Sequence, residues 1–225
     1  MRTTKLTDHL FQLTRFGAIN AYLVGECDGF TLVDTTLGGA ADDLIAAAAE
    51  AGGPIKRIAL THGHLDHVGS LDTLKHRLGS SVEVSMGELD ARILAGEKVV
   101  EGRLPGSWPK VKTAPDARLS GGETIGSLEV VLTPGHSPGH VAFRDTRDDT
   151  VIAGDVFTSF GGVAVSNHFY FRFPFAAMAT WDQAKDLQSA RAIRALNPSL
   201  LVVGHGLATR LPTAAIDAAI RQAQR

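Results

Sequence analysis

The chain has a single cysteine among its 225 residues. Cys27 has no partner for a disulfide within the chain, which is typical of proteins that fold in a reducing compartment. No apolar run approaches the ~18 residues that a membrane span needs, and residues 1–10 are too polar to form the apolar part of a signal peptide. We therefore expect a cytoplasmic protein with no membrane partner.

An excess of charge is also absent, because 22 Lys and Arg oppose 24 Asp and Glu for a formal net charge of -2. The basic residues form no stripe, so the sequence predicts no nucleic-acid partner. A hydrophobic content of 44% is ample for one large core in a chain of this length. We predict one domain over residues 1–225, with two αβ halves, about 1–95 and 117–225, that are joined by an irregular loop at 96–116.

Three of the nine histidines lie within one short segment. Residues 61–67 read THGHLDH, which places three imidazoles and a carboxylate directly after an apolar run that is predicted to be a strand. Residues two apart on an extended segment point the same way, so His62 and His64 are predicted to hold one metal ion together. Asp66 and His67 lie where the chain turns into the next helix, and they suit a second ion.

Further metal ligands are predicted at the ends of other apolar runs. A catalytic zinc typically takes three protein ligands and leaves one position for water, so four residues from one loop cannot complete two sites. His136, Asp155 and His205 each follow a β-rich run and have glycine beside them. This repeated layout predicts a site at one edge of a sheet core.

Together these residues resemble the metallo-β-lactamase-fold hydrolases, and more closely their glyoxalase II-like and lactonase-like branch. The resemblance covers nearly the whole chain. It implies an α/β fold, a four-layered αβ/βα sandwich with a dinuclear metal site at the edge of two facing mixed sheets. It also implies that one metal is held by His62, His64 and His136, and the other by Asp66, His67 and His205, with Asp155 bridging both.

A pair of adjacent divalent ions indicates hydrolytic chemistry. Zn²⁺ is the expected ion, with iron or manganese as alternatives. A water that bridges the ions loses its proton readily, because bound zinc can lower the pKa of water to about 7. The resulting hydroxide is predicted to attack an ester, thioester or lactone carbonyl, while the ions stabilise the oxyanion and the leaving group. Asp66 is the predicted catalytic residue, since it is both a ligand and a carrier of the proton to the leaving group.

Other activities of the same fold stay open. A sulfur (persulfide) dioxygenase would use one iron, held by residues that correspond to His62, His136 and Asp155, and two imidazoles with a carboxylate suit non-haem iron. Glyoxalase II has a further C-terminal segment that helps bind glutathione, whereas twenty residues follow His205 here. Lactonases of the family often carry a tyrosine three residues after the bridging aspartate, where this chain has Thr158. A β-lactamase and a non-catalytic metal-binding module are disfavoured.

Two segments are predicted to decide which small molecule binds. The first is the loop 96–116, which is long for a compact domain. The second is an expected loop at 157–175, which holds seven of the fourteen aromatic residues. This second segment forms either an apolar wall over the metals or a packing surface, so a monomer and a homodimer both stay open. The candidate substrate-binding residues are Trp108, Phe157, Thr158, Phe160, His168 and Tyr170.

The remaining pattern predicts strands and helices in both halves. Helices are expected at about 40–51, 68–78, 87–95, 181–196 and 212–224. Strands are expected at about 10–16, 19–24, 30–34, 55–60, 82–85, 128–133, 150–153 and 200–203. His140 is expected to support the site rather than to bind metal. Asp34 either caps the turn after its strand or orients a metal-ligating imidazole.

Overall fold

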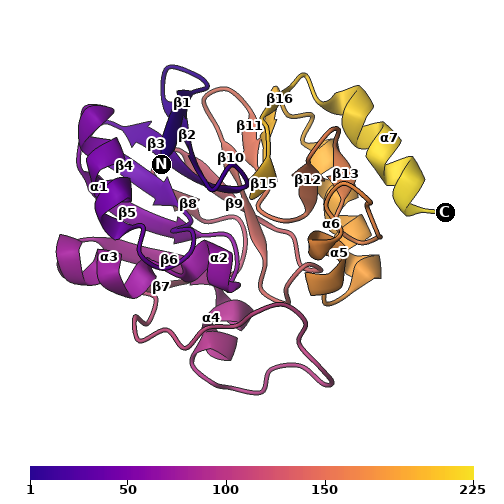
Figure 1. Cartoon of the computed structure of the whole chain (residues 1–225), viewed down its shortest axis with the longest axis horizontal. Coiled ribbons are helices and arrows are strands. Elements are labelled where there is room, and N and C mark those ends of the chain that lie inside the picture. Colours follow the sequence, from indigo (N-terminus) through magenta and orange to yellow (C-terminus); the bar gives the residue numbers. More distant parts are fainter.

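Alternating apolar side chains build two large sheets that pack face to face (Figure 1). A computed structural model describes residues 1–225 as a mixed α/β fold, as predicted. The first sheet has seven strands in the order β1-β2-β3-β4-β5-β6-β7. They are β1 (Arg2–Lys5), β2 (Leu10–Arg15), β3 (Ile19–Glu26), β4 (Gly29–Val33), β5 (Ile55–Leu60), β6 (Glu83–Gly87) and β7 (Ala117–Leu119). Strands β1 to β4 pair antiparallel, and β4 to β7 pair parallel.

The second sheet has six strands in the order β16-β14-β11-β10-β9-β8. They are β8 (Thr124–Ile125), β9 (Leu128–Leu132), β10 (Val141–Asp145), β11 (Thr150–Ile152), β14 (Leu200–Val202) and β16 (Thr209–Arg210). A small third sheet has the order β13-β12-β15, from β12 (Phe157–Ser159), β13 (Ala164–Val165) and β15 (His205–Gly206). The parallel pairing of β12 with β15 places Thr158 opposite His205.

Three apolar cores separate four layers, and strand β3 shows how the strands serve two of them. Tyr22 and Val24 point into the core between the two large sheets. Ala21 and Leu23 alternate with them and point into the core under the helices of the first half. Both faces of the central strands are therefore buried, and helices must cover the outer face of each sheet.

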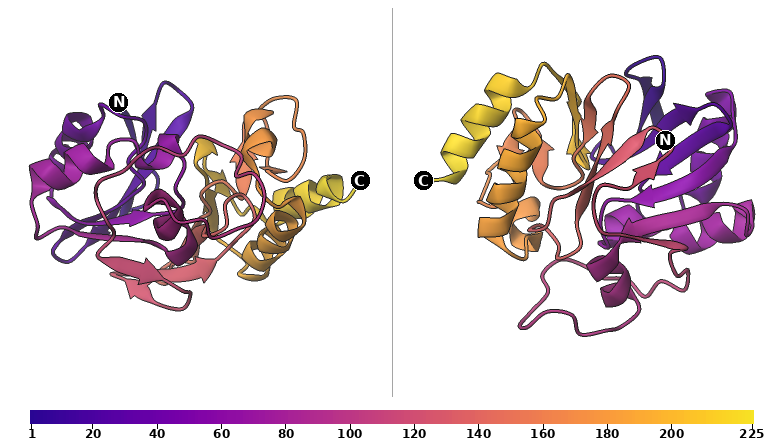
Figure 2. Two further views of the ribbon diagram at one scale, coloured as in Figure 1. Left: turned by 90° about the horizontal axis from the view of Figure 1, so that it is seen from below. Right: turned by 180° about the vertical axis from the view of Figure 1, so that it is seen from behind.

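Helices provide these outer layers (Figure 2). Over the first sheet, α1 (Ala41–Glu50), α3 (Leu71–Leu78) and α4 (Glu88–Leu94) contribute side chains to the outer core. Over the second sheet, α6 (Gln183–Ala195) and α7 (Thr213–Ala223) do the same. The short helices are α2 (Leu65–Val68) and α5 (Phe175–Ala179). The result is the expected four-layered αβ/βα sandwich, and none of its helices combines the length and apolar character that a membrane crossing requires.

Two local expectations were wrong. The helix predicted at 68–78 is two helices, because α2 begins earlier and the chain breaks at Gly69 and Ser70. A Cβ on Gly69 would lie 2.6 Å from the backbone nitrogen of Gly38, so the chain makes a close approach here. The Ser70 hydroxyl donates to the carbonyl of Leu37 and accepts from the backbone of Ala40, which fixes the break. The aromatic segment 157–175 is likewise not one loop, since it contains β12 and β13 and reaches the start of α5.

Candidate metal centre

The predicted metal ligands converge because four strands end at the same edge of the sandwich. Strand β5 leads into the segment 61–67, and β9 leads into the loop that carries His136. Strand β11 ends just before Asp155, and β14 ends just before His205. The ends of these four strands bring together residues that are up to 143 positions apart, which no local pattern in the sequence places in contact.

His62, His64 and His136 form a compact three-histidine cluster. The Nε2 atom of His62 and the Nε2 atom of His136 each lie 3.1 Å from Nδ1 of His64. All three side chains are buried. Three imidazole nitrogens that all lie within 4.8 Å of one another can be directed at one ion, so this cluster is a candidate metal site.

Asp66, His67 and His205 form a second cluster beside the first. The Nε2 atom of His205 lies 3.1 Å from Oδ2 of Asp66 and 3.2 Å from Oδ2 of Asp155. Asp155 Oδ1 lies 3.5 Å from Nε2 of His67, and Asp155 Oδ2 lies 3.5 Å from Nε2 of His136. The Asp155 carboxylate therefore faces both clusters.

Four of the five imidazoles are held by a hydrogen bond on the nitrogen that faces away from the clusters. The bonds join Nδ1 of His62 to Thr61 Oγ1 (3.0 Å), Nδ1 of His67 to Asp34 Oδ2 (2.8 Å), Nδ1 of His136 to Thr180 Oγ1 (3.0 Å) and Nδ1 of His205 to the Ala18 carbonyl (3.1 Å). The hydroxyls of Thr61 and Thr180 already donate elsewhere, so they accept here. Each Nδ1 must carry the proton, which leaves Nε2 free to bind a metal.

His64 is the exception, because its Nδ1 faces the cluster. Its Nε2 is buried without a hydrogen-bond partner and lies against Gly106. The indole of Trp108 packs on the His64 ring at 4.9 Å between centroids, and the backbone of Leu65 donates to the Ser107 carbonyl at 2.8 Å. The loop 96–116 thus packs directly on one candidate ligand, and contact with that loop, rather than a hydrogen bond, orients the His64 ring.

Asp34 orients the imidazole of His67, a candidate metal ligand, in agreement with one of its two predicted roles. Its Oδ2 accepts from Nδ1 of His67 and from the Thr61 hydroxyl, both at 2.8 Å, and its Oδ1 accepts from the Thr61 backbone at 2.8 Å. Asp34 has a φ of 63°, a left-handed conformation that Asp and Asn tolerate better than most residues. This conformation turns its carboxylate back toward the segment 61–67.

Replacing Asp34 by alanine is expected to weaken metal binding by about 10- to 100-fold, because Nδ1 of His67 then loses the acceptor that fixes its tautomer. Equilibrium dialysis against Zn²⁺ measures the change. Asp34→Asn is the matched comparison, since Asn keeps one acceptor oxygen and tolerates the positive φ, and it should lie between the wild type and Asp34→Ala. Equal affinity in all three proteins would contradict the orienting role.

His140 supports Asp155, as the sequence predicted. Its Nε2 accepts a hydrogen bond from the Asp155 backbone at 3.1 Å, and its Nδ1 lies 2.8 Å from Thr133 Oγ1. A backbone N–H can only donate, so Nε2 is unprotonated and Nδ1 carries the proton. Burial lowers the pKa of His140 to about 3, in agreement with a neutral ring. His140 therefore fixes the backbone of Asp155 and offers no lone pair to a metal.

The two clusters differ in protonation. Burial, with the neighbouring imidazoles, lowers the pKa of His62 and His136 well below the usual value and that of His64 to about 4. Against the same burial, the Asp155 carboxylate raises the pKa of His67 well above the usual value and that of His205 to about 10. The three-histidine cluster is therefore neutral, whereas the second cluster holds protons that a bound metal would replace.

Buried atoms without partners show that the site fits metal ions. Nε2 of His67 and Oδ1 of Asp155 are buried and make no hydrogen bond, although they lie 3.5 Å from each other, within ion-pair distance. Buried polar atoms that make no hydrogen bond are rare in proteins and need an explanation. Imidazole nitrogens with carboxylate oxygens are donors that suit zinc, iron or manganese. A pair of divalent ions, one at each cluster, would satisfy these atoms.

The cavity at the metal centre is small, at about 90 Å³, and has an aromatic wall. Its lining residues are His64, Asp66, Gly106, Ser107, His136, Asp155, Phe173, Phe175, Ala176, Ala179 and His205. The ring of Phe173 lies 4.8 Å from that of His205 and stacks on Phe160 at 4.9 Å. Phe173 and Phe175 were not singled out from the sequence, although the density of aromatic residues in 157–175 was the signal that pointed to them.

The six candidate substrate-binding residues lie in different places. Trp108 packs on His64, and Phe160 lies behind Phe173. Phe157 is in the core under α6 and α7, and Thr158 is buried, where its hydroxyl donates to the His205 carbonyl. Of the remaining two, His168 has its Nδ1 3.1 Å from Asn167 Oδ1, and the Tyr170 hydroxyl donates to the Phe160 carbonyl. None of the six residues lines the metal cavity.

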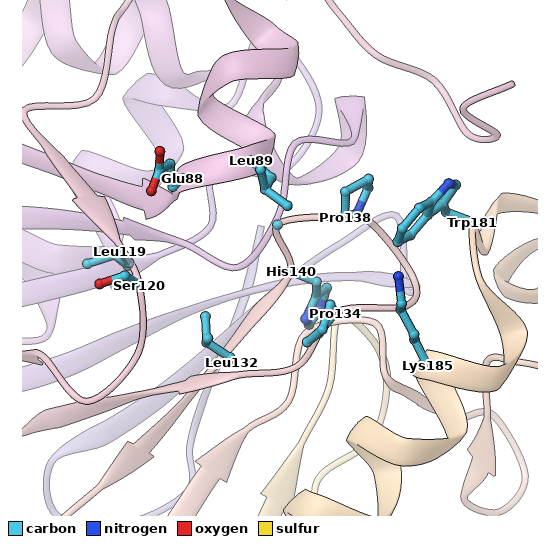
Figure 3. A pocket seen from close by; sticks show the side chains of 11 residues that line it. Glu88, Leu89, Leu119, Ser120, Leu132, Pro134, Pro138, His140, Trp181 and Lys185 are labelled. Carbon is cyan, nitrogen blue, oxygen red and sulfur yellow. The ribbon is translucent and has the colours of Figure 1, made fainter. Parts of the chain in front are cut away.

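A second cavity of about 370 Å³ shares no residue with the metal cavity (Figure 3). Leu89 from α4 and Leu132 from the end of β9 supply apolar walls, and His140 forms part of the lining. Lys185 and Trp181 close one side, with the Lys185 ammonium 4.5 Å from the centre of the indole ring. The larger cavity therefore borders the loop that supports the metal centre without reaching its ligands.

Known proteins with similar sequences and structures bear on this site. Residues 14–205 match the family model described as Metallo-beta-lactamase superfamily. The chain is 42% identical to the protein YobT of Bacillus subtilis (strain 168), and the match covers 96% of each chain. It is 31% identical to the hydroxyacylglutathione hydrolase GloC of Haemophilus influenzae over 53% of this chain and 58% of the relative. A solved structure of TTHA1623 in a di-iron-bound form superposes with a TM-score of 0.68 and 28% identity, covering 91% of this chain and 95% of the other.

Proposed function

Because the chain belongs to the metallo-beta-lactamase superfamily and is a metal-dependent hydrolase, we propose that it cleaves an ester, thioester or lactone at a dinuclear metal centre. The observation that carries this proposal is the pair of three-residue clusters with the Asp155 carboxylate between them. A mononuclear site would leave the second cluster, Asp66, His67 and His205, without a purpose.

The seven proposed ligands divide between two metal ions in the same way as the two clusters. In this proposal His62, His64 and His136 hold one ion, Asp66, His67 and His205 hold the other, and Asp155 serves both. When bound, two such ions supply a water of lowered pKa and polarise the scissile carbonyl. Zn²⁺ remains the expected ion; the di-iron form of the relative TTHA1623 supports iron as the alternative.

Asp66 is the proposed proton carrier. Its side chain is 31% exposed, whereas those of Asp155 and His205 are each 6% exposed. Asp66 is therefore the more solvent-accessible of these proposed ligands. Against its partial burial, His67 and His205 hold the pKa of Asp66 below its usual value. The ionised carboxylate accepts a proton in the cavity and releases it to the leaving oxygen or sulfur.

The lining of the metal cavity favours an uncharged substrate. It contains no lysine or arginine, and Phe173, Phe175, Ala176 and Ala179 form an apolar side. The metal ions of this proposal would be the only cations there, and a substrate carboxylate bound to them would compete with the scissile carbonyl for the same open positions. GloC supports thioester chemistry by its name, but the glutathione part of such a substrate is anionic and finds no lysine or arginine in this cavity. We propose a small molecule with an apolar group next to the scissile carbonyl.

The free cysteine supports a proposed location in the cytoplasm. Cys27 is exposed, unpaired and outside the metal cavity, so it takes no part in the proposed mechanism. A free thiol of this kind persists in a reducing compartment.

Metal analysis of the purified protein, followed by a substrate panel, tests the proposal. We expect two divalent ions per chain and turnover of uncharged aryl esters, thioesters or lactones. Matched substrates that carry a carboxylate beside the acyl group should be at least about tenfold poorer in kcat/KM, which corresponds to about 1.4 kcal/mol, because no lysine or arginine pairs with the carboxylate and its binding to the ions would displace the scissile carbonyl. β-Lactams and persulfides complete the panel. One iron per chain with oxygen uptake on a persulfide would instead establish the dioxygenase.

A further inference from the structure

Asp90, in the first turn of α4, is a fully buried carboxylate outside both candidate ligand clusters. It accepts three hydrogen bonds. Its Oδ2 accepts from the Gly63 backbone at 2.9 Å and from the Ser137 hydroxyl at 2.6 Å, and its Oδ1 accepts from the Gly139 backbone at 2.6 Å. Both carboxylate oxygens are therefore used, and all three donors come from loops rather than from the helix that carries Asp90.

Two of the three donors adjoin residues of the three-histidine cluster. Gly63 lies between His62 and His64, and Ser137 follows His136, whereas the third donor, Gly139, adjoins His140. One carboxylate thus joins the two chain segments that together provide the three-histidine cluster.

The second cluster is supported by different residues. Asp34 holds His67, and the Ala18 carbonyl accepts from His205. The segment around His205 is further fixed by Asn20, whose side-chain amide donates to the carbonyls of Val203 and Gly206. None of these groups bonds to Asp90, and the one link to the first cluster is the bond of Asp34 to Thr61, which holds Nδ1 of His62.

Two glycines allow the close approach that Asp90 needs. A Cβ on Gly139 would lie 2.9 Å from Oδ1 of Asp90 and closer still to the Asp90 backbone nitrogen. A Cβ on Gly87, at the start of α4, would collide with the Gly139 carbonyl. The loop after His136 is therefore packed directly on the first turn of α4, which brings the Gly139 backbone within hydrogen-bond distance of the carboxylate.

We propose that Asp90 is a positioning residue that holds the three-histidine half of the metal centre in place. The proposal rests on the dinuclear site described above. A carboxylate suits this position because both of its oxygens accept, whereas an asparagine has one acceptor and one NH₂ group. In Asp90→Asn the NH₂ group must face at least one of the three donors, whichever way the amide is turned. That donor then loses its partner in a buried place, and the segment beside it shifts.

Zn²⁺ binding to the metal-free full chain tests the proposal. Titration in competition with a chromophoric chelator gives the stoichiometry and the affinity of each ion. We expect the wild type to bind two ions and Asp90→Asn to bind one of them about 10- to 100-fold more weakly, with the affinity of the other unchanged. Co²⁺ substitution adds a spectroscopic measure, because the absorption of the ion held by three imidazoles should change and that of the other should not.

Asp145→Asn is the matched control. Asp145 is also a buried aspartate that accepts hydrogen bonds, from the backbone and the side chain of Arg147, but it lies at the far end of β10 from both ligand loops. It should leave both affinities at the wild-type values. Where Asp90→Asn fails to fold, Ser137→Ala removes a single donor from the same carboxylate. This variant should lower the affinity for the same ion to a smaller extent.

If Asp90→Asn lowered the affinity for both ions equally, or for neither, the proposed role of Asp90 would be wrong. Wild-type stoichiometry decides the dinuclear centre separately. If the wild type binds only one ion, the dinuclear proposal fails, while the ratio of variant to wild-type affinity for that ion still decides whether Asp90 positions the three-histidine cluster.

Discussion

Replacing Asp155 by alanine is expected to lower kcat/KM at least about 1,000-fold, because several kcal/mol of metal-dependent stabilisation are lost when the group shared by both clusters is removed. Oδ1 of Asp155 faces His67, and Oδ2 faces His136 and His205. Without this carboxylate each cluster keeps three candidate ligands but loses its common anion. We therefore expect the fold to persist and the reaction to stop.

Steady-state kinetics on the best substrate of the panel, together with metal analysis and circular dichroism, measures this effect. Asp145→Ala is a suitable control, since Asp145 is also a buried aspartate but lies at the far end of β10 from His140. Its pairing with Arg147 contributes to stability, so this variant should melt earlier and still turn over substrate. Full turnover by Asp155→Ala would show that the carboxylate does not join the two metal sites.

Removal of the metals is expected to abolish turnover and to lower the melting temperature by about 8–16 °C. A ligand at 1,000 times its Kd stabilises the folded state by about 4 kcal/mol, and each kcal/mol corresponds to about 2–4 °C for a chain of this size. The physical reason is the buried cluster of five imidazoles and two carboxylates, whose unpartnered atoms are costly without an ion.

Thermal melts with and without a chelator measure the shift, and added Zn²⁺ should restore both the melting temperature and the activity. The same chelator should barely change the melting temperature of Asp155→Ala, because that variant binds metal poorly to begin with. An unchanged melting temperature after complete metal removal from the wild type would contradict a structural contribution of the ions.

Much of the candidate site could be predicted from the sequence because its parts are local. The spacing of His62, His64, Asp66 and His67 follows from one strand end and the turn after it. His136, Asp155 and His205 were marked by the apolar runs before them and by adjacent glycines. The alternation of apolar residues likewise predicted the strands, since their period does not depend on which strands pair.

The residues that support the site could not be predicted in this way. Asp90 lies 27 positions from Gly63 and 47 from Ser137, and Thr180 lies 44 positions from His136. No motif joins such residues, because their contacts arise from the packing of α4 and of the segment before α6 against the ligand loops. The break between α2 and α3 has the same origin, since it depends on the close approach of Gly69 to Gly38.

The sequence by itself determined the donors, histidine nitrogens and aspartate oxygens that suit a divalent metal, because donor chemistry belongs to the side chain and its spacing to the local backbone. Only the tertiary structure decided which nitrogen of each histidine faces the site, which groups hold it there and which walls enclose the cavity. Hydrogen-bond partners and cavity walls come from segments that are distant in the chain, so packing alone brings Thr180, Asp90 and Phe173 to the metal centre.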